Sequence, residues 1–526
     1  MQKSFSCLVG FILFSFNISL AQFGNNPPFK VETEAIANTN TIGLHSFAFA
    51  QSGSKWLFIG GRTNGLHGFT LGTGFQVQDA NNQMVVIDTT TWQTWYTSLN
   101  VLPLNIADPL RSTNMEYYQD GNYLYMIGGY GYDSIQAKNI TFSTLTAIHI
   151  DSTINAVISG KTINAFIRQI TDSRIQVCGG EMEKVANKFY LFFGHNYNGD
   201  YPDLNATQEY INQIKTFTIA DDGTNLSISN YSAITDSVEF HRRDLTVAPI
   251  VNPDESFSIA AYAGVFKPNF KPFTHPIYVD SSSVFIDTAY NQVMSLYTCA
   301  RVPMYDSATQ NMYTVFLGGV STNYYDETTQ QLLYSAKIPF TDDVTVLTKY
   351  ANGTTQETLL PFQLPALIGK NAKFIFNQSV SHYSNHVIKL HALSQRTHVG
   401  YFFGGIRASQ PNNGVSVAND SIYRIFITPK AINSIKNIET LNPSLRIFPN
   451  PAKTNITISF HLSNFEHVQL TIYDVIGKKI KTPLDKDMNE GDYSISIDAS
   501  DLTSNLYLCQ LRTESIFQVI RFTVIK

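Results

Sequence analysis

The segments WLFIGGRTNG, from Trp56, and YLYMIGGYGY, from Tyr123, introduce a pattern that repeats along the chain, an apolar strand that ends in small residues. Four later segments share it: FYLFFGHNYNG from Phe189, FSIAAYAGVF from Phe257, YTVFLGGVST from Tyr313 and VGYFFGGIRA from Val399. Their glycines are 54 to 86 residues apart, at Gly60, Gly128, Gly194, Gly264, Gly318 and Gly404. This spacing indicates one supersecondary unit per repeat and therefore predicts six similar units.

The residues after the first glycine pair, MVVIDTTTWQTWYTSL, predict the rest of a unit. Residues 85–87 predict a third strand and residues 88–90 a turn, while Trp92 and Trp95 begin an outer fourth strand. A four-stranded unit cannot bury both faces alone, so such units stack around an axis. A double glycine permits positive φ and close packing against the neighbouring unit.

The first unit, with Gly60-Gly61, Asp88 and Trp95, resembles a kelch repeat of the β-propeller kind. The second, fifth and sixth units keep a glycine pair, whereas the third has Gly194-His195 and the fourth Ala263-Gly264. Later units lack the tryptophan, and their spacing exceeds that of typical kelch repeats, which implies extended loops on one rim. The resemblance therefore implies an all-β, six-bladed kelch-like β-propeller.

We assign residues 22–428 to this domain and expect its two ends to meet. The last unit runs through DSIYRIFITPK, from Asp420, and lacks an outer strand. FKVETEAI, from Phe29, alternates as a strand should and precedes the first unit. Pairing of Val31 with the strand around Ile425 would close the last sheet and remove an open edge.

Residues 429–443 are polar, without strong periodicity, and predict a linker. Residues 444–526 then contain short alternating runs with evenly spaced turn signals, including LRIFPNPAKTNITISF from Leu445 and VQLTIYDVIGKKIK from Val468. This pattern predicts a small Ig-like antiparallel β-sandwich.

The C-terminal residues resemble the sorting domain of type IX (Por) secretion cargo from bacteria of the Bacteroidota type. The matching motif residues occur in the family's order: Phe448, Pro449, Asn450, Pro451, Tyr473, Asp474, Gly477, Tyr507 and Lys526. Asn505 departs from the glycine that the family carries before its Leu/Ile-Tyr pair. The resemblance implies passage through periplasm and outer membrane by the type IX machinery and its sortase, followed by release or attachment at the cell surface. The alternative is a generic Ig-like accessory module.

Residues 1–21, MQKSFSCLVGFILFSFNISLA, have the charge, apolar run and small residues of a signal peptide, with cleavage expected after Ala21. The apolar run is shorter than a membrane span, so no transmembrane anchor is expected. The remaining cysteines are Cys178, Cys299 and Cys509, an odd number that argues against a disulfide framework. Cys178 and Cys299 either pair across neighbouring blades or are buried as small apolar residues.

The composition limits the classes of partner. Hydrophobic residues make up 43% of the chain and charged residues 15%, with a formal net charge of −5. Neither a basic footprint for nucleic acid nor a polybasic stretch for a membrane surface is present in the sequence.

Ligand sites of propellers lie at the mouth of the central channel, where the innermost strands begin. Residues near those predicted starts are His45, Asn114, Glu116, Glu181, His241, Arg242, Arg243, Arg301 and His391. Arginines that converge with a glutamate can bind a carboxylate-bearing or hydroxyl-rich ligand. Alternatively, these residues are solvated or ion-paired rim residues.

The histidine cluster His382, His386, His391 and His398 has no carboxylate or cysteine to complete a familiar ligand set, so we predict no metal and no cofactor. Even spacing would place His382 and His386 on one strand face. The sequence contains neither a GxSxG elbow nor an HExxH motif.

We therefore favour a non-catalytic binding module for a glycan or surface protein. The alternative is a carbohydrate-active enzyme on a kelch propeller, similar to a sialic-acid epimerase or to galactose oxidase. A deep pocket that unites Arg243, Arg301 and Glu116 or Glu181 would favour an enzyme or a specific anionic ligand, and a shallow polar rim would favour a binding role.

Overall fold

The computed structural model describes residues 26–37, 39, 41–267, 271–296, 298–326, 328–412, 414–430, 445–462, 464–475, 478–513 and 517–526. The predicted signal peptide with its cleavage site after Ala21, most of the predicted linker and Gly477 of the sorting motif lie outside these residues. The chain divides into two compact units, Met1–Ala431 and Ile432–Lys526. Both are built mainly from antiparallel strands, so the chain is all-β.

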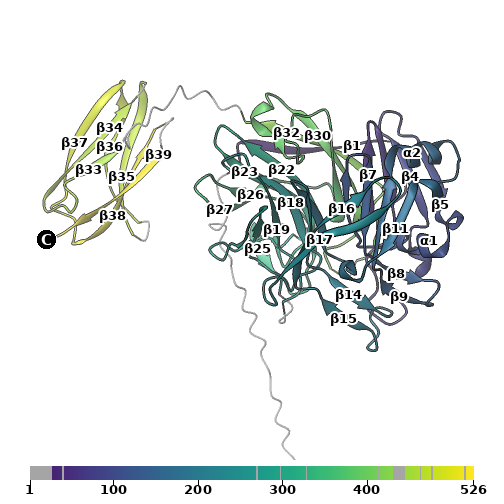
Figure 1. The fold of residues 1–526 in the computed structure, drawn as a ribbon. Helices are drawn as coiled ribbons and strands as arrows, with labels where there is room; N and C mark the ends of the chain where they lie inside the picture. Colours follow the sequence, from purple (N-terminus) through teal and green to yellow (C-terminus); the bar gives the residue numbers. More distant parts are fainter. Residues whose placement is uncertain are drawn as a thin grey trace, which may run out of the picture. The chain divides into compact units, whose positions relative to one another are not determined.

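Over the described residues, the first unit contains six sheets that each have four strands in antiparallel meander order (Figure 1). Sheet 1 contains, in order, β2(Ala48–Ser52), β3(Lys55–Ile59), β4(Gln83–Asp88) and β5(Thr94–Ser98). Sheet 2 contains β6(Glu116–Asp120), β7(Tyr123–Ile127), β10(Thr144–His149) and β11(Ile167–Thr171). Sheet 3 contains β12(Glu181–Val185), β13(Lys188–Phe192), β16(Gln213–Asp221) and β17(Leu226–Thr235). Sheet 4 contains β18(Thr246–Val251), β19(Phe257–Tyr262), β20(Ile277–Val279) and β21(Val284–Ile286). Sheet 5 contains β22(Ala300–Asp306), β23(Asn311–Val320), β26(Phe340–Lys349) and β27(Thr355–Gln363). Sheet 6 contains β28(Lys370–Phe376), β30(Thr397–Ala408), β32(Ile422–Pro429) and β1(Phe29–Ala35).

Shorter elements decorate these sheets. Strands β29(Ile388–Lys389) and β31(Ser416–Ala418) extend sheets 5 and 6. Insertions after β7 and β13 form a separate sheet from β8(Tyr130–Asp133), β9(Lys138–Thr141), β14(His195–Asn198) and β15(Thr207–Tyr210). A hairpin of β24(Asn323–Asp326) and β25(Gln331–Tyr334) and the helices α1(Leu104–Leu110) and α2(Ile150–Ile158) complete the unit.

The first strands of the six sheets follow one another in space in chain order. Strand β2 packs near β6, β6 near β12, β12 near β18, β18 near β22 and β22 near β28. The backbone N–H of Gly405 in sheet 6 donates to the carbonyl of Leu44, just before β2, at 2.8 Å. The last sheet therefore returns to the first.

Six residues with positive φ lie beside the starts of these first strands, and we call them the polar ring: Ser46, Asn114, Gly179, Asp244, Thr298 and Asn371. Each N–H of Asn114, Gly179 and Asp244 donates to the carbonyl of the preceding ring residue, at 3.2, 2.9 and 2.7 Å. Asn371 N–H donates to Thr298 at 2.7 Å, and its side-chain amide donates to Ser46 Oγ at 2.6 Å. Backbone amides thus link neighbouring sheets through a left-handed conformation that asparagine and aspartate adopt more readily than most side chains.

The glycine pairs make a second set of links between sheets. The second residue of a pair donates its N–H to the carbonyl two residues before the following polar-ring residue, as in Gly61 to Ser112 at 2.8 Å and Gly129 to Val177 at 2.9 Å. A Cβ on Gly128 would lie 1.9 Å from the Val177 carbonyl oxygen. Glycine is therefore required here both by its φ of +63° and by the neighbouring sheet.

The predicted pairing between the first and last strands of the first unit is confirmed. β1 pairs with β32 in antiparallel register, with Val31 opposite Ile427 and Thr33 opposite Ile425. Phe29 and Val31 are buried in the core that sheets 5 and 6 share. The N-terminal strand is thus an integral part of the last sheet.

Three local expectations were wrong. The left-handed pair of the third unit is Phe193-Gly194, because Phe193 has φ of +54° and His195 begins β14. Trp92 lies in the turn before β5, with φ of +59°, since β5 begins at Thr94. His382 and His386 do not share one strand face, because His382 forms an isolated bridge with Ile388 and His386 lies in the turn between them, where its N–H bonds back to Tyr383.

The second unit contains two antiparallel sheets around one apolar core. One sheet has the order β33(Arg446–Phe448), β34(Asn455–Leu462), β37(Gly491–Asp498), and the other β36(Lys479–Met488), β35(Glu466–Asp474), β38(Asn505–Arg512), β39(Phe517–Val524). The core is formed by residues such as Ile456, Leu470, Cys509 and Phe522.

Replacement of Gly128 by alanine should destabilise the first unit by more than replacement of Gly121. Both glycines have positive φ, but nothing lies within 4 Å of a Cβ at Gly121. Gly121→Ala should therefore cost only left-handed strain, about 1 kcal/mol, whereas Gly128→Ala adds a clash with backbone. Chemical denaturation of the two variants measures the difference, and equal losses would contradict the role of the Gly128–Val177 contact.

Candidate functional site

A hollow of about 730 Å³, here called the mouth pocket, lies on the side of the polar ring residue Asp244. Its lining includes His67, Tyr201, Arg243, Asp244, Lys337 and Lys370, together with the aromatic rings of Phe69, Phe266 and Phe340. A smaller hollow of about 50 Å³ shares His67, Tyr201, Arg243 and Asp244 and adds Asn114, His195 and Gln208. The polar ring itself surrounds a passage of about 40 Å³.

Arg243 and Asp244 are placed together because they immediately precede β18, where the chain enters the polar ring. They form an ion pair, and the guanidinium of Arg243 also lies 5.1 Å from the centre of the Phe266 ring. Burial disfavours both charges and acts to raise the pKa of Asp244, but the positive groups around it, Arg243 first and then Lys370, together outweigh burial and lower that pKa. Nε of Arg243 is buried and has no hydrogen-bond partner among the described residues. This pair is therefore charged, with a donor still unused.

Two histidines of this region are neutral at pH 7. Burial lowers the pKa of His67 to about 4 and that of His195 to about 3. His67 stacks on Phe75 at 4.6 Å and meets Tyr201 edge-on at 5.0 Å. Nδ1 of His195 lies 2.7 Å from the amide nitrogen of Gln208. Their role is thus to present polar and aromatic surface without charge.

The mouth pocket nevertheless has an excess of positive charge. Burial lowers the pKa of Lys370 to about 8, which leaves it mostly protonated at neutral pH, and its Nζ lies 2.8 Å from Thr298 Oγ1. Arg243, Lys337 and Lys370 therefore face a single carboxylate, Asp244, in the lining. Cations beside aromatic rings are a suitable environment for an anionic ligand with an apolar face.

Of the candidates predicted from sequence, Asn114 and Arg243 line these hollows. Glu181 and Arg301 do not reach the mouth pocket but line a separate hollow of about 170 Å³. Glu181 also lines the passage within the polar ring. The arginines expected to converge are therefore divided between two hollows.

His45 and Glu116 are buried beneath the surface. Nδ1 of His45 lies 3.0 Å from Ser46 Oγ, and burial lowers its pKa to about 3. Glu116 accepts a hydrogen bond from the N–H of Gly180 at 2.7 Å, and burial raises its pKa well above the usual range. Their contacts assign them to the links between sheets and not to a ligand-facing surface.

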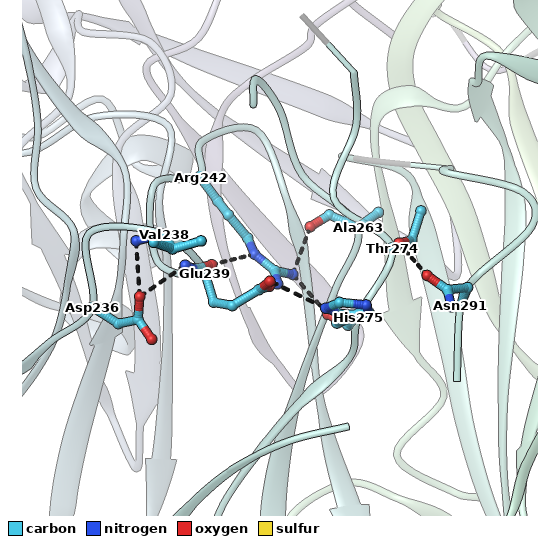
Figure 2. A network of polar contacts seen from close by, with 8 residues as sticks. All are labelled: Asp236, Val238, Glu239, Arg242, Ala263, Thr274, His275 and Asn291. Carbon is cyan, nitrogen blue, oxygen red and sulfur yellow. Dashed lines mark hydrogen bonds and ion pairs between the residues drawn. The ribbon is translucent and has the colours of Figure 1, made fainter. Parts of the chain in front are cut away.

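Arg242 is adjacent to Arg243 in the sequence, but its guanidinium is fully engaged with other groups of the protein (Figure 2). Its guanidinium donates to Glu239 O at 2.6 Å, Ala263 O at 3.1 Å and His275 O at 2.9 Å, and pairs with the Glu239 carboxylate at 2.6 Å. The side chain has no exposed surface. Arg242 thus joins the segment before β18 to the segments that flank β19 and β20.

The two remaining candidates lie elsewhere. Nδ1 of His241 is 2.9 Å from the Asn212 side chain, and its ring stacks on Tyr210 at 3.9 Å. His391 contacts Ser307, just after the end of β22, whereas Arg301 is near the start of that strand. His391 therefore lies at the opposite end of β22 from the polar ring.

Sequence reasoning missed His67, His195, Asp244 and Lys370. Asp244 could have been identified, because it stands two residues before β18 as Asn114 stands two residues before β6. His67 and Lys337 come from long segments between strands, for which the repeat pattern gives no register. Within the described parts of the chain, no group of three or more His, Cys, Asp or Glu side chains could hold a metal ion. Cys178, Cys299 and Cys509 are free and buried, as the second of the two interpretations predicted.

In the second unit, several predicted motif residues fix the sandwich. Asn450 accepts from Thr523 N–H at 2.8 Å and donates to Arg521 O at 3.2 Å. Tyr507 is buried, with its ring stacked on Phe522 and its hydroxyl bonded to Thr503 O at 3.1 Å. The side chain of Phe448, by contrast, is 76% exposed.

Comparison with known families identifies this unit. Residues 446–526 match a secretion system C-terminal sorting domain. The chain thus carries a type IX secretion sorting domain. It is therefore delivered to the cell surface or the extracellular space, and the predicted localisation is confirmed. None of the helices in the described residues is long and apolar enough to cross a membrane. No curated protein gives a significant match to the chain.

Replacement of Arg242 by methionine should destabilise this protein by about 3–5 kcal/mol, because it removes the donor to Oε2 of Glu239 and leaves buried carbonyls unpaired. Arg407→Met is the matched control, since Arg407 is exposed and should change stability by less than about 0.5 kcal/mol. Urea denaturation gives both values. A loss at Arg242 no larger than that at Arg407 would contradict the structural assignment.

Stability should also decrease as pH falls below about 6.5, and His195 should contribute. Its folded-state pKa, about 3, is below the unfolded value, so between these two pH values the unfolded chain binds a proton that the folded chain does not. In His195→Gln, the free energy of unfolding should fall less steeply as pH decreases, with a slope smaller by about 1.4 kcal/mol per pH unit in this window. Denaturation at pH 7, 6, 5 and 4 measures this slope. Parallel slopes for wild type and variant would exclude a buried neutral His195.

Proposed function

We propose that the six sheets are the blades of a kelch-like β-propeller over residues 22–428. The proposal is supported by the order in which β2, β6, β12, β18, β22 and β28 pack, by the polar ring, and by the pairing of β1 with β32. In this arrangement the polar ring surrounds the central channel and the mouth pocket opens beside it. Residues 429–443 then link the propeller to the sorting domain at 444–526.

We further propose that the propeller is a non-catalytic binding module whose mouth pocket takes a carboxylate-bearing glycan. The observation that carries this proposal is the lining of that pocket, in which three cations stand against one carboxylate. A sugar carboxylate would pair with Arg243 and Lys370, which both line the pocket.

The aromatic part of the lining supports a saccharide over a simple anion. Phe69 is 65% exposed, which is unusual for so large an apolar side chain, and it lies 4.8 Å from the His67 ring. Tyr201 and Phe266 add further aromatic faces beside the cations. Apolar faces of sugar rings pack on such surfaces, while their polar groups reach the cations and the polar ring.

The proposal implies three kinds of partner for the exported chain. The type IX machinery and its sortase would engage the sorting domain, and a surface or soluble glycan would occupy the mouth pocket. A surface protein that carries such a glycan is the form of protein ligand most compatible with this lining.

A glycan array probed with the full chain should give signals for sialylated or uronic-acid glycans and not for their neutral counterparts. Lys337→Gln should weaken binding severalfold and Arg243→Gln by at least about tenfold, which corresponds to about 1.4 kcal/mol. Binding should also weaken with added salt, because exposed charges are screened.

Arg407→Gln serves as the control, because it removes an exposed arginine outside the mouth pocket. Lys337 is exposed, so its substitution tests the pocket without loss of a buried contact. Absence of binding to every glycan, or binding that both pocket variants retain, would refute the glycan proposal. Conversion of a bound glycan into product by the wild-type chain would refute the non-catalytic role.

A further inference from the structure

A second hollow, here called the inner chamber, is separate from the mouth pocket and has a volume of about 170 Å³. The first strands of the six sheets all contribute to its lining. Glu181 and Lys373 line both the inner chamber and the passage of about 40 Å³ within the polar ring. The passage is therefore a constriction between the chamber and the side on which Asp244 lies.

Four charged side chains face this chamber, with Glu181 and Glu183 on β12, Arg301 on β22 and Lys373 on β28. Their side chains are 12–17% exposed, so they are neither solvated nor fully enclosed. Glu181 and Glu183 point the same way because side chains two residues apart share one face of a strand. Two carboxylates and two cations give the cluster no net charge when all four are ionised.

These ion pairs are loose. Nη2 of Arg301 is 3.4 Å from Glu183 Oε1 and 3.9 Å from Glu181 Oε2, and Nζ of Lys373 is 3.4 Å from Glu181 Oε1. Optimal charge-assisted hydrogen bonds are about 2.7–2.9 Å long. Arg301 and Lys373 therefore lie near carboxylates but form only long hydrogen bonds with them, which leaves hydrogen-bonding capacity for a ligand.

The contrast with Arg242 shows what a saturated guanidinium looks like in this fold. Arg242 makes four hydrogen bonds of 2.6–3.1 Å (Figure 2). Over the described residues, Arg301 makes one, at 3.4 Å. Both arginines precede or begin the first strand of a sheet, but only Arg301 has donors to spare beside a hollow.

Part of the remaining wall of the inner chamber is aromatic. Nζ of Lys373 lies 5.2 Å from the centre of the Tyr117 ring, and Tyr117 meets Phe49 edge-on at 5.7 Å. Phe374 and Phe376 of β28 also line the chamber. Alternating acceptors and donors opposite aromatic faces match a ring that carries several hydroxyl groups, since each hydroxyl both donates and accepts.

We propose that the inner chamber is a second binding site, which takes a single uncharged sugar ring or similar polyol. Vicinal hydroxyls donate to Glu181 and Glu183 and accept from Arg301 and Lys373, and the apolar face of the ring packs on the aromatic wall. A net anion is disfavoured because it meets two carboxylates, and a net cation because it meets Arg301 and Lys373. The volume equals that of about six water molecules, which limits the ligand to one ring.

Calorimetric titration of the full chain with D-galactose, D-mannose and N-acetyl-D-glucosamine tests the proposal, with D-glucuronate and glycine as the anionic and zwitterionic probes. At least one neutral sugar should bind, and neither charged probe should bind more tightly. Arg301→Met and Glu183→Gln should each weaken that sugar at least tenfold. Glu183→Gln keeps the shape of the side chain, so it tests the site even where Arg301→Met lowers stability.

Two controls separate this site from the mouth pocket. Lys337→Gln and Arg407→Met lie outside the inner chamber and should leave neutral-sugar affinity unchanged. No binding of any neutral sugar, preference for glucuronate or glycine, or affinity unchanged in Glu183→Gln and Arg301→Met would each overturn the proposal. Loss of neutral-sugar binding in Lys337→Gln would do so as well, because it would place that sugar in the mouth pocket.

Discussion

Hydrogen bonds between backbone groups of neighbouring sheets are the interaction on which the first unit depends. Apolar packing between sheets is non-directional and would tolerate sliding. The bonds from the glycine pairs, such as Gly129 to Val177, and those within the polar ring fix how each sheet is placed on the next. They require a left-handed backbone at consecutive positions, which explains why glycine recurs there while most other residues of the unit vary. Where Phe193 and Ala263 occupy the first position of a pair, the same conformation is retained at a cost in strain.

The same constraint shapes the mouth pocket. A polar-ring residue must have a small or hydrogen-bonding side chain to adopt positive φ beside the central passage, and Asp244 is the one that is charged. Its neighbour Arg243 is therefore carried to the mouth pocket by the geometry of the ring, whereas Arg242, one residue earlier, is turned into the protein. The two adjacent arginines thus have different surroundings, because successive side chains of an extended segment point to opposite sides.

The repeat pattern allowed the strands of the first unit and the pairing of β1 with β32 to be predicted from the sequence, because both depend on local signals of apolar alternation and turn residues. The C-terminal sorting domain was predicted from its own motif residues. The candidate site was predicted only in part. Asn114, Glu181, Arg243 and Arg301 do line hollows, but the sequence could not divide them between two, since that depends on which face of each first strand is turned toward the passage. His67, Tyr201 and Lys337 come from long loops, whose paths are set by contacts distant in sequence. The even spacing of His382 and His386 suggested a strand, yet His386 has positive φ and lies in the turn between the bridged residues His382 and Ile388.

The pairing of β1 with β32 also has a mechanical consequence. The chain leaves the first unit at Pro429, the last residue of β32, and continues toward the sorting domain. Tension on that C-terminal extension is therefore applied to a strand that is hydrogen-bonded to β30 on one edge and to β1 on the other. Two ladders must break before β32 detaches, whereas an edge strand would have only one. A protein held by its C-terminal end thus bears load through an inner strand of its last sheet, which is paired on both edges.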